Sequence, residues 1–268
     1  MKRIKITGVF LVVLLLIHPL PASTEEKGPV GGTVQPYLSL TTFSLGDLIK
    51  PRTISFAANS VRDRISLDTA AVITSSATSF TDAFLETGLG VEFTSHYSPR
   101  IDFLTGVVYR KLNGKSFNGF RINGPATISF SGLGSLTATQ AGNIRVSMDD
   151  ASEWGGGFGL RYYLHKSNNY SVYTRGSLGF LQTADIIARI SLADQSSSKI
   201  RVRFFNPKLL FYGEGGLGAE YRWGNFEMKG EVRLEWIQKR QVADAASALV
   251  FTDSVLNVPV VLGVVWRF

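Results

Sequence analysis

Apolar and polar residues alternate with a period of two along most of this chain, which is the pattern of β-strands that have two different faces. The clearest example is 226–240, where Phe226 and Met228 alternate with Glu227 and Lys229. The same pattern predicts strands at 84–96, 100–112, 152–165, 170–183, 208–223, 226–240 and 257–268, with a less regular one near 37–45. We therefore expect an all-β fold.

The connections between these strands are alternately long and short. The long ones are 46–81, 113–151, 184–207 and 241–256, and the short ones are 97–99, 166–169 and 224–225. Tight turns on one side and long loops on the other are typical of a transmembrane antiparallel up-and-down β-barrel. We predict such a barrel, with eight strands and four long extracellular loops, rather than a soluble β-sandwich with the same alternation.

Two stretches inside the long loops also have strand character. These are Thr127–Phe130 and Val202–Phe205. They indicate either strands that continue above the membrane or a further spanning pair, which would make ten strands and a wider lumen.

Aromatic residues gather at both ends of the predicted strands, as expected at the two surfaces of a bilayer. Beside the short turns and the chain ends lie Tyr37, Tyr97, Tyr163, Tyr170, Trp223, Phe226, Trp266 and Phe268. Towards the long loops lie Tyr109, Trp154, Phe180, Phe211 and Trp236.

The N-terminus has the composition of a cleaved secretory signal peptide. A basic start with Lys2, Arg3 and Lys5 precedes an apolar run over 6–17, shorter than the about 20 residues of a spanning helix. A membrane anchor is the alternative. We expect a signal peptide at 1–22, a periplasmic N-terminal segment at 23–36, and an outer-membrane barrel at 37–268. Loss of the three basic residues lowers the net charge from +7 to +4.

The last residues, Gly263-x-x-Trp266-x-Phe268, resemble the C-terminal signal of bacterial outer-membrane proteins. In that family the signal is read by the barrel assembly machinery, and the final strand closes the barrel against the first. The mature chain is similar to small OmpA-like or opacity-protein-like barrels of Gram-negative bacteria, here without a periplasmic domain. The resemblance implies an integral outer-membrane location.

The polar faces of the strands define a predicted interior charge network. Its members are Glu86, Glu92, Asp102, Arg110, Glu153, Arg161, Arg175, Glu214, Glu220, Arg222, Glu227, Lys229, Glu231, Arg233 and Glu235, with Lys239 and Arg267 as further cations. Near balance of the two signs is what a paired interior requires, since an unpaired buried charge is costly. A salt-bridged plug is favoured over a narrow porin-like conduit, because open channels belong to wider barrels.

Catalytic and metal chemistry have little support in the sequence. The mature chain has two histidines, His96 and His165, and both map to short turns, away from the outer leaflet where a lipid hydrolase would act. A triad of Ser95, His96 and Asp102 is disfavoured because adjacent strand residues point to opposite faces. With no cysteine, we expect no metal site, no cofactor and no enzyme activity.

The long loops are where a function would reside. Counted over 46–81, 111–151, 184–207 and 239–256, they carry 14 basic and 9 acidic residues. The predicted contacts with lipopolysaccharide are Lys50, Arg52, Arg62, Arg64, Lys115, Arg121, Lys199, Arg201 and Arg203; an ordinary solvated loop surface is the alternative. We expect a structural or surface-interaction role, with outer-membrane lipid as a partner, no nucleic acid, and an extracellular ligand that the sequence does not identify.

Overall fold

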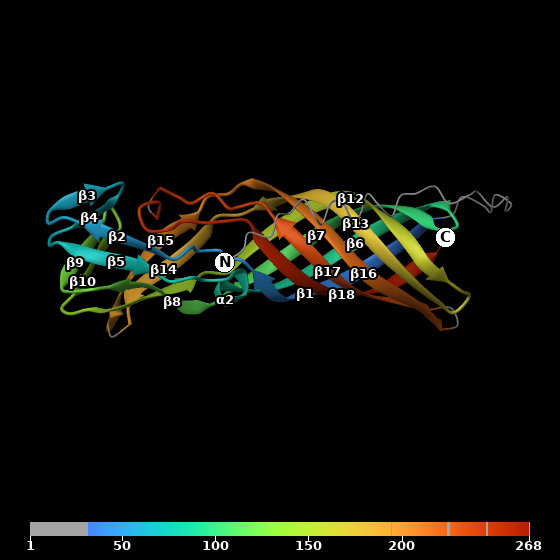
Figure 1. Ribbon diagram of the computed structural model, residues 1–268, viewed down its shortest axis with the longest axis horizontal. Helices are drawn as coiled ribbons and strands as arrows, with labels where there is room; N and C mark the ends of the chain where they lie inside the picture. The colour runs from blue at the N-terminus through green and yellow to red at the C-terminus, as the bar shows by residue number, and fades with distance from the viewer. Residues whose placement is uncertain (1–31, 194, 224–225, 245, 268) are drawn as a thin grey trace.

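A computed structural model describes residues 32–193, 195–223, 226–244 and 246–267 (Figure 1). The predicted signal peptide therefore lies outside the described residues. The first strand, β1 (Gly32–Leu45), begins within the segment that was expected to precede the barrel.

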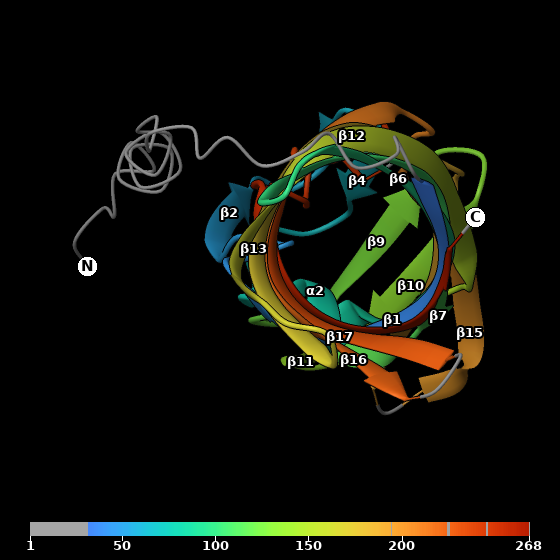
Figure 2. The same ribbon diagram turned by 90° about the vertical axis from the view of Figure 1, so that its right-hand side faces the viewer.

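Eight antiparallel strands form a closed barrel, as predicted (Figure 2). Its neighbours follow the order β1, β18, β17, β16, β13, β12, β7, β6, and β1 pairs with both β18 and β6. The remaining barrel strands are β6 (Phe84–Ser98), β7 (Ile101–Gly114), β12 (Ala151–Lys166), β13 (Tyr170–Thr183), β16 (Leu209–Trp223), β17 (Phe226–Ile237) and β18 (Val255–Arg267). The ten-strand alternative is wrong, because 127–130 and 202–205 belong to other sheets.

The outer face of the barrel is apolar over most of its height. Large side chains such as Leu38, Phe158, Leu217 and Leu262 are each more than 60% exposed. The inward residues between them are mostly polar, charged or glycine. A protein in water would place these two sets of side chains the other way round.

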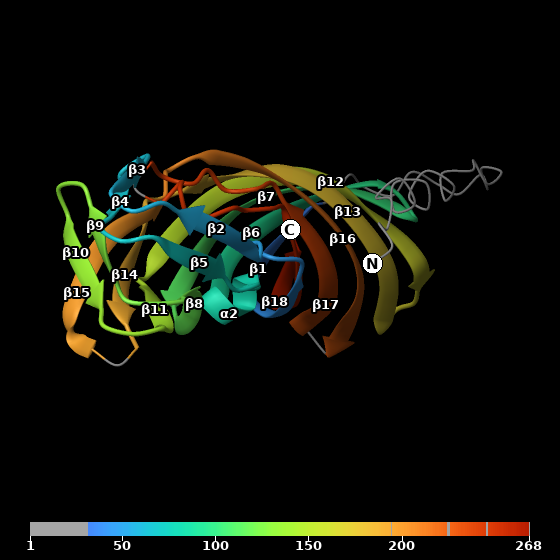
Figure 3. The same cartoon turned by 60° about the vertical axis from the view of Figure 1, so that its left-hand side comes forward.

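The four long connections fold into two further sheets, which we call the cap (residues 46–83, 115–150, 184–208 and 238–254). The six-stranded sheet has the order β15 (Gln195–Phe205), β14 (Ile186–Leu192), β11 (Gly142–Met148), β8 (Ser116–Ile122), β5 (Ala71–Ser75) and β2 (Arg52–Phe56). The four-stranded sheet has the order β10 (Gly134–Ala138), β9 (Ala126–Phe130), β4 (Ile65–Leu67) and β3 (Ser60–Arg62). Figures 1 and 3 show the cap extending from one end of the barrel.

The cap has its own hydrophobic core. Alternate residues of its strands are buried, among them Ile73, Ile122, Ile128, Val146 and Val202. The cap is therefore a folded β unit rather than four separate loops.

The core of the cap continues into the mouth of the barrel. Near their cap-side ends, six barrel strands contribute inward apolar residues that are at most 3% exposed, which we call the apolar layer: Phe84, Leu112, Leu181, Leu210, Ile237 and Val255. The short helix α2 (Phe80–Ala83) buries Phe80 and Ala83 at the same level and lies within the outline of the ring in Figure 2. A capping box between Ser79 and Asp82 starts this helix.

In the described part of the chain, no helix is long and apolar enough to cross a membrane.

Candidate functional site

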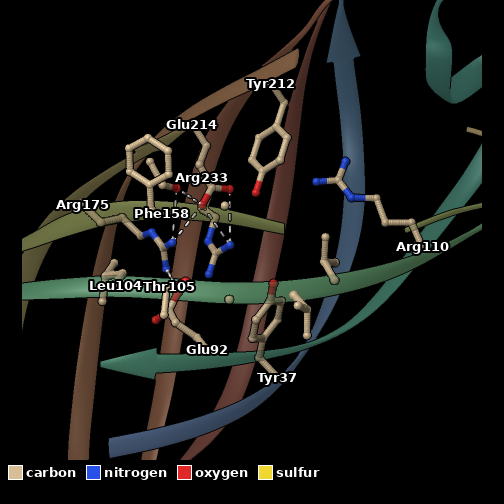
Figure 4. Close-up of a pocket in the computed structure, with 15 residues that line it drawn as sticks. Tyr37, Glu92, Leu104, Thr105, Arg110, Phe158, Arg175, Tyr212, Glu214 and Arg233 are labelled. Atoms are coloured by element: carbon tan, nitrogen blue, oxygen red, sulfur yellow. Dashed lines mark hydrogen bonds and ion pairs between the residues drawn. The ribbon is translucent and has the colours of Figure 1, made fainter. Parts of the chain in front are cut away.

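The middle of the barrel contains a network of buried ion pairs (Figure 4). Glu92 on β6 accepts hydrogen bonds from Arg175 at 2.7 Å and from Lys229 at 3.1 Å. Glu214 on β16 accepts from Arg175 at 2.9 Å and from Arg233 at 3.3 Å. Arg175 thus joins two carboxylates that come from strands far apart in the sequence.

Arg161 is fully enclosed in the network, with no exposed surface. Its guanidinium donates to Glu220 at 2.6 Å, to Glu92 at 3.0 Å and to the amide oxygen of Gln35 at 2.9 Å. It also lies 4.4 Å from the centre of the Tyr173 ring, within cation–π range. These contacts connect β12 with β1, β6, β13 and β16 across the lumen.

A second cluster lies nearer the cap, directly below the apolar layer. Arg110 donates two hydrogen bonds to the carboxylate of Glu235, one of them at 2.8 Å, and lies 3.4 Å from Glu86. Arg240 forms an ion pair with Glu153 at 2.5 Å, and both side chains are buried. The two-bond pairing between Arg110 and Glu235 fixes the position of both partners.

Arg240 takes the interior place that the sequence had assigned to Lys239. Odd-numbered residues of β17 face inward up to Ile237, so alternation alone would turn Lys239 inward as well. The strand ends at Ile237, the alternation is lost, and Lys239 is exposed while Arg240 is buried. Arg267 belongs to β18, but its side chain is outside the described part of the structure.

At the short-turn end, His96 Nδ1 lies 2.7 Å from the fully buried carboxylate of Asp102. The other oxygen of Asp102 accepts a hydrogen bond from Tyr163 at 2.9 Å. Ser95 lies on the opposite, exposed face of β6, so the three side chains of the disfavoured triad do not converge. His165 stacks on Tyr170 with ring centroids 4.8 Å apart.

The last predicted pair of the network lies at the same end. Arg222 and Glu227 face each other across the turn between β16 and β17, with 3.2 Å between their charged atoms. The Arg222 side chain is 42% exposed, unlike the deeper cations.

Several aromatic residues are placed differently from the prediction. Tyr37 and Tyr163 were expected at the membrane surface, but both point into the lumen. A Cβ on Gly90 would lie 2.3 Å from the Tyr37 ring, so this inward ring occupies the space that the glycine leaves on the neighbouring strand. Tyr173 lies against Gly218 in the same manner.

The other predicted aromatic positions that are described do face outward. Towards the short turns these are Tyr97, Tyr170, Trp223 and Phe226, and towards the cap they are Tyr109, Trp154, Phe180, Phe211 and Trp236. The side chains of Trp266 and Phe268 are outside the described residues.

A small cavity lies among the ion pairs of the barrel interior. The cavity lined by Tyr37, Glu92, Arg175 and Arg233 has a volume of about 30 Å³. This is room for one or two water molecules, not for a solute with a hydration shell. The ion pairs around this cavity and the apolar layer above it both occupy the lumen.

The cations predicted to meet lipopolysaccharide do not form one cluster. Lys50 pairs with Asp253 at 2.7 Å, and Lys115 donates to the carbonyl of Thr81 at 2.7 Å. Arg62 and Arg64 belong to the β3–β4 hairpin, at the end of the cap away from the barrel (Figure 1).

Four others belong to the six-stranded sheet, on its exposed face. They are Arg121, Lys199, Arg201 and Arg203. Arg52 lies at the start of β2 with its guanidinium 3.9 Å from the centre of the Phe251 ring.

Among the described residues, there is no group of three or more His, Asp or Glu side chains that could hold a metal ion.

No protein-family model and no curated protein matches this sequence. Distant likenesses appear among solved structures, and three of them are described next. Ail of Yersinia pestis, solved with the heparin analogue sucrose octasulfate, is 9% identical, with 89% of this chain and 99% of that chain covered and a TM-score of 0.37. The outer membrane protein AlkL is 13% identical, with coverage of 94% and 96% and a TM-score of 0.34. The outer membrane protease OmpT from Escherichia coli is 9% identical, with coverage of 92% and 100% and a TM-score of 0.34. Identities and TM-scores this low assign no function to this chain.

Sequence reasoning missed two features of the site. The first is the role of neutral groups, since Gln35 and the inward tyrosines bind carboxylates or cations of the network. The second is the cap as a folded unit: strands beyond the barrel were expected only at 127–130 and 202–205, although others show the same alternation, for example at Ile186, Ala188 and Ile190. The alternation was visible, but loops of uneven length obscured which strands would pair.

Proposed function

We propose that this protein is an outer-membrane barrel that is closed to solutes and holds a folded β cap at the cell surface. The observation that carries the proposal is the inverted polarity of the barrel, with ion pairs inside and a continuous apolar face outside. Exposure of the apolar side chains on that face to water would raise the free energy, whereas contact with lipid tails would not. A closed barrel satisfies every backbone group within the bilayer.

A structural and surface-interaction role is supported over the narrow conduit. The lumen holds cross-linked charged side chains, and the cavity among them has a volume of about 30 Å³. The cap supplies a folded surface built from all four long connections. Two further expectations stand with this proposal: Gly263, Trp266 and Phe268 serve as the assembly signal, and the cations near the barrel rim, Lys115 among them, meet phosphates of lipopolysaccharide.

Conductance of the purified protein in planar bilayers tests the closed barrel. We expect no current steps from this protein over the voltages at which a known porin gives steady ohmic steps in the same bilayers. Steady steps from this protein would favour the conduit. The known porin serves as the positive control for the sensitivity of the bilayers.

Protease treatment of intact cells tests the placement of the cap. Cleavage confined to 46–83, 115–150, 184–208 and 238–254 is expected. Recovery of the mature chain as a soluble periplasmic monomer would contradict the membrane location. The lipid hydrolase alternative predicts a changed lipid profile in cells that carry His96→Ala, whereas we expect no change.

A further inference from the structure

The exposed face of the six-stranded sheet is strongly basic. Its outward positions on β8, β11, β14 and β15 carry six cations: Arg121, Arg145, Arg189, Lys199, Arg201 and Arg203. Among the described residues, the acidic side chains that pair with these cations are Asp149 and Asp185, just outside the strands. Alternation explains the arrangement, since the opposite face of the same strands belongs to the cap core.

The two acidic residues neutralise only part of this charge. Asp149 lies 3.1 Å from Arg189 and 3.4 Å from Arg201, and these two arginines stand directly opposite each other on β14 and β15. Like charges opposite each other destabilise a sheet unless an anion lies between them. Within the described part of the chain, Arg145 and Lys199 have no ion-pair partner.

A pocket of about 230 Å³ opens on this face where the β14–β15 register shifts between Ile190 and Leu192. Its charged lining is Arg145, Arg189 and Lys199. The remaining lining residues are Ser116, Ser147, Ser191, Leu192 and Ala193. Three cations and three hydroxyl groups thus surround one concave site.

We propose that this pocket binds a phosphate or sulfate ester carried on a carbohydrate. Guanidinium and ammonium groups suit tetrahedral oxyanions, and the serine hydroxyls can exchange hydrogen bonds with sugar hydroxyls. The volume exceeds that of a single oxyanion. No aromatic ring is among the lining residues described, so a base-stacking site for a nucleotide is not supported.

The proposal deepens the proposed function, because it rests on the cap being exposed at the cell surface. Such an ester has two possible sources. One is the phosphorylated core of a surface glycolipid in the same leaflet, and the other is a sulfated polysaccharide outside the cell.

Binding to the refolded full-length mature protein in detergent micelles provides the test. The probes are a phosphorylated lipopolysaccharide core oligosaccharide, the same oligosaccharide after removal of phosphate, a dextran sulfate oligosaccharide, and unsulfated dextran. We expect at least one anionic probe to bind and neither neutral one. Tighter binding of the phosphorylated core assigns the site to a glycolipid, and tighter binding of the sulfated chain assigns it to an external polysaccharide.

Two double variants with the same loss of charge separate a built site from general attraction. Arg145→Gln with Lys199→Gln should weaken binding roughly tenfold or more. Arg62→Gln with Arg64→Gln, on the far hairpin, should leave it within about twofold. Equal weakening by both pairs, no weakening by the first pair, or equal binding of a neutral probe overturns the proposal.

Folding of each variant is checked by the gel mobility of the unheated barrel. All four substituted residues are exposed, so correct folding is expected. A conducting barrel with an intact binding response would overturn the closed lumen and leave the pocket standing. A barrel that does not conduct and does not bind the anionic probes selectively would overturn the pocket and leave the closed lumen standing.

Discussion

Replacement of Arg161 by methionine should destabilise the barrel more than any change at its rim. The guanidinium has no exposed surface and makes three charge-assisted contacts, to Glu220, Glu92 and Gln35. Methionine retains much of the side-chain volume but none of the donors. Removal of one partner of a buried ion pair costs about 3–5 kcal/mol, because the remaining charge stays buried.

The structure narrows this range. Glu92 keeps Arg175 and Lys229 as donors, so its loss is partly compensated. Glu220 loses its 2.6 Å contact and keeps a longer hydrogen bond from Tyr163 at 3.4 Å, so a larger share of the destabilisation arises at Glu220. We therefore expect about 3 kcal/mol for Arg161→Met. Adding Glu220→Gln should recover part of it, since the buried charge is then removed as well.

Urea unfolding in lipid vesicles, followed by tryptophan fluorescence, measures this difference. The matched control is Arg222→Met, since Arg222 also pairs with a carboxylate of a barrel strand but is 42% exposed. That variant should cost less than about 1 kcal/mol. The reasoning is refuted if both variants cost the same, or if Arg161→Met unfolds at the wild-type urea concentration with an unchanged slope.

Three further predictions follow from single contacts. Phe158→Arg on the outer face should cost about 2–4 kcal/mol in lipid vesicles while Phe158→Leu costs little; equal unfolding midpoints would contradict a lipid-facing position. Gly218→Val should cost about 1–3 kcal/mol in the same assay, because a Cβ there lies 2.5 Å from the Tyr173 ring, and Tyr173→Ala should relieve it. Ile190→Ala in the cap core should cost about 2–5 kcal/mol and speed trypsin cleavage of the cap, with unchanged gel mobility of the barrel as its control.

The barrel strands were predictable because each has one uniform outer face. Their observed bounds differ from the predicted ones by at most a few residues, except for β1, where the prediction began at 37 and the strand begins at Gly32. Pro36 interrupts the sequence there, yet a proline is tolerated at a strand position where its missing N–H is not required. The alternation of apolar and polar residues does not show whether a proline occupies such a position, so the start of β1 was placed too late.

The partners inside the lumen were less predictable. Alternation says that Arg161 points inward, but not that it meets Glu220 rather than a nearer carboxylate on its own strand. That choice depends on barrel closure and on the stagger between strands, which bring together residues 59 positions apart in the sequence. The inward tyrosines were predicted at the membrane surface for a related reason. An aromatic residue near a strand end is compatible both with the membrane surface and with the barrel interior.

The cap and the barrel use the same alternating strand pattern with opposite polarity: the cap buries its apolar face, and the barrel exposes it. The junction between them is where the surroundings change from water to lipid. Along β7, the outward residue Tyr109 is followed by outward Lys111, while inward Arg110 is followed by inward Leu112. The outer face thus changes from apolar to charged, and the inner face from charged to apolar, within the four residues 109–112. The exchange has a simple cause. Where lipid surrounds the strand, apolar side chains are favourable on its outer face; where water surrounds it, apolar side chains are favourable only when they are buried on its inner face. We therefore expect the apolar layer at the level where the strands leave the bilayer, and the same residues that fill the mouth of the barrel also begin the core of the cap.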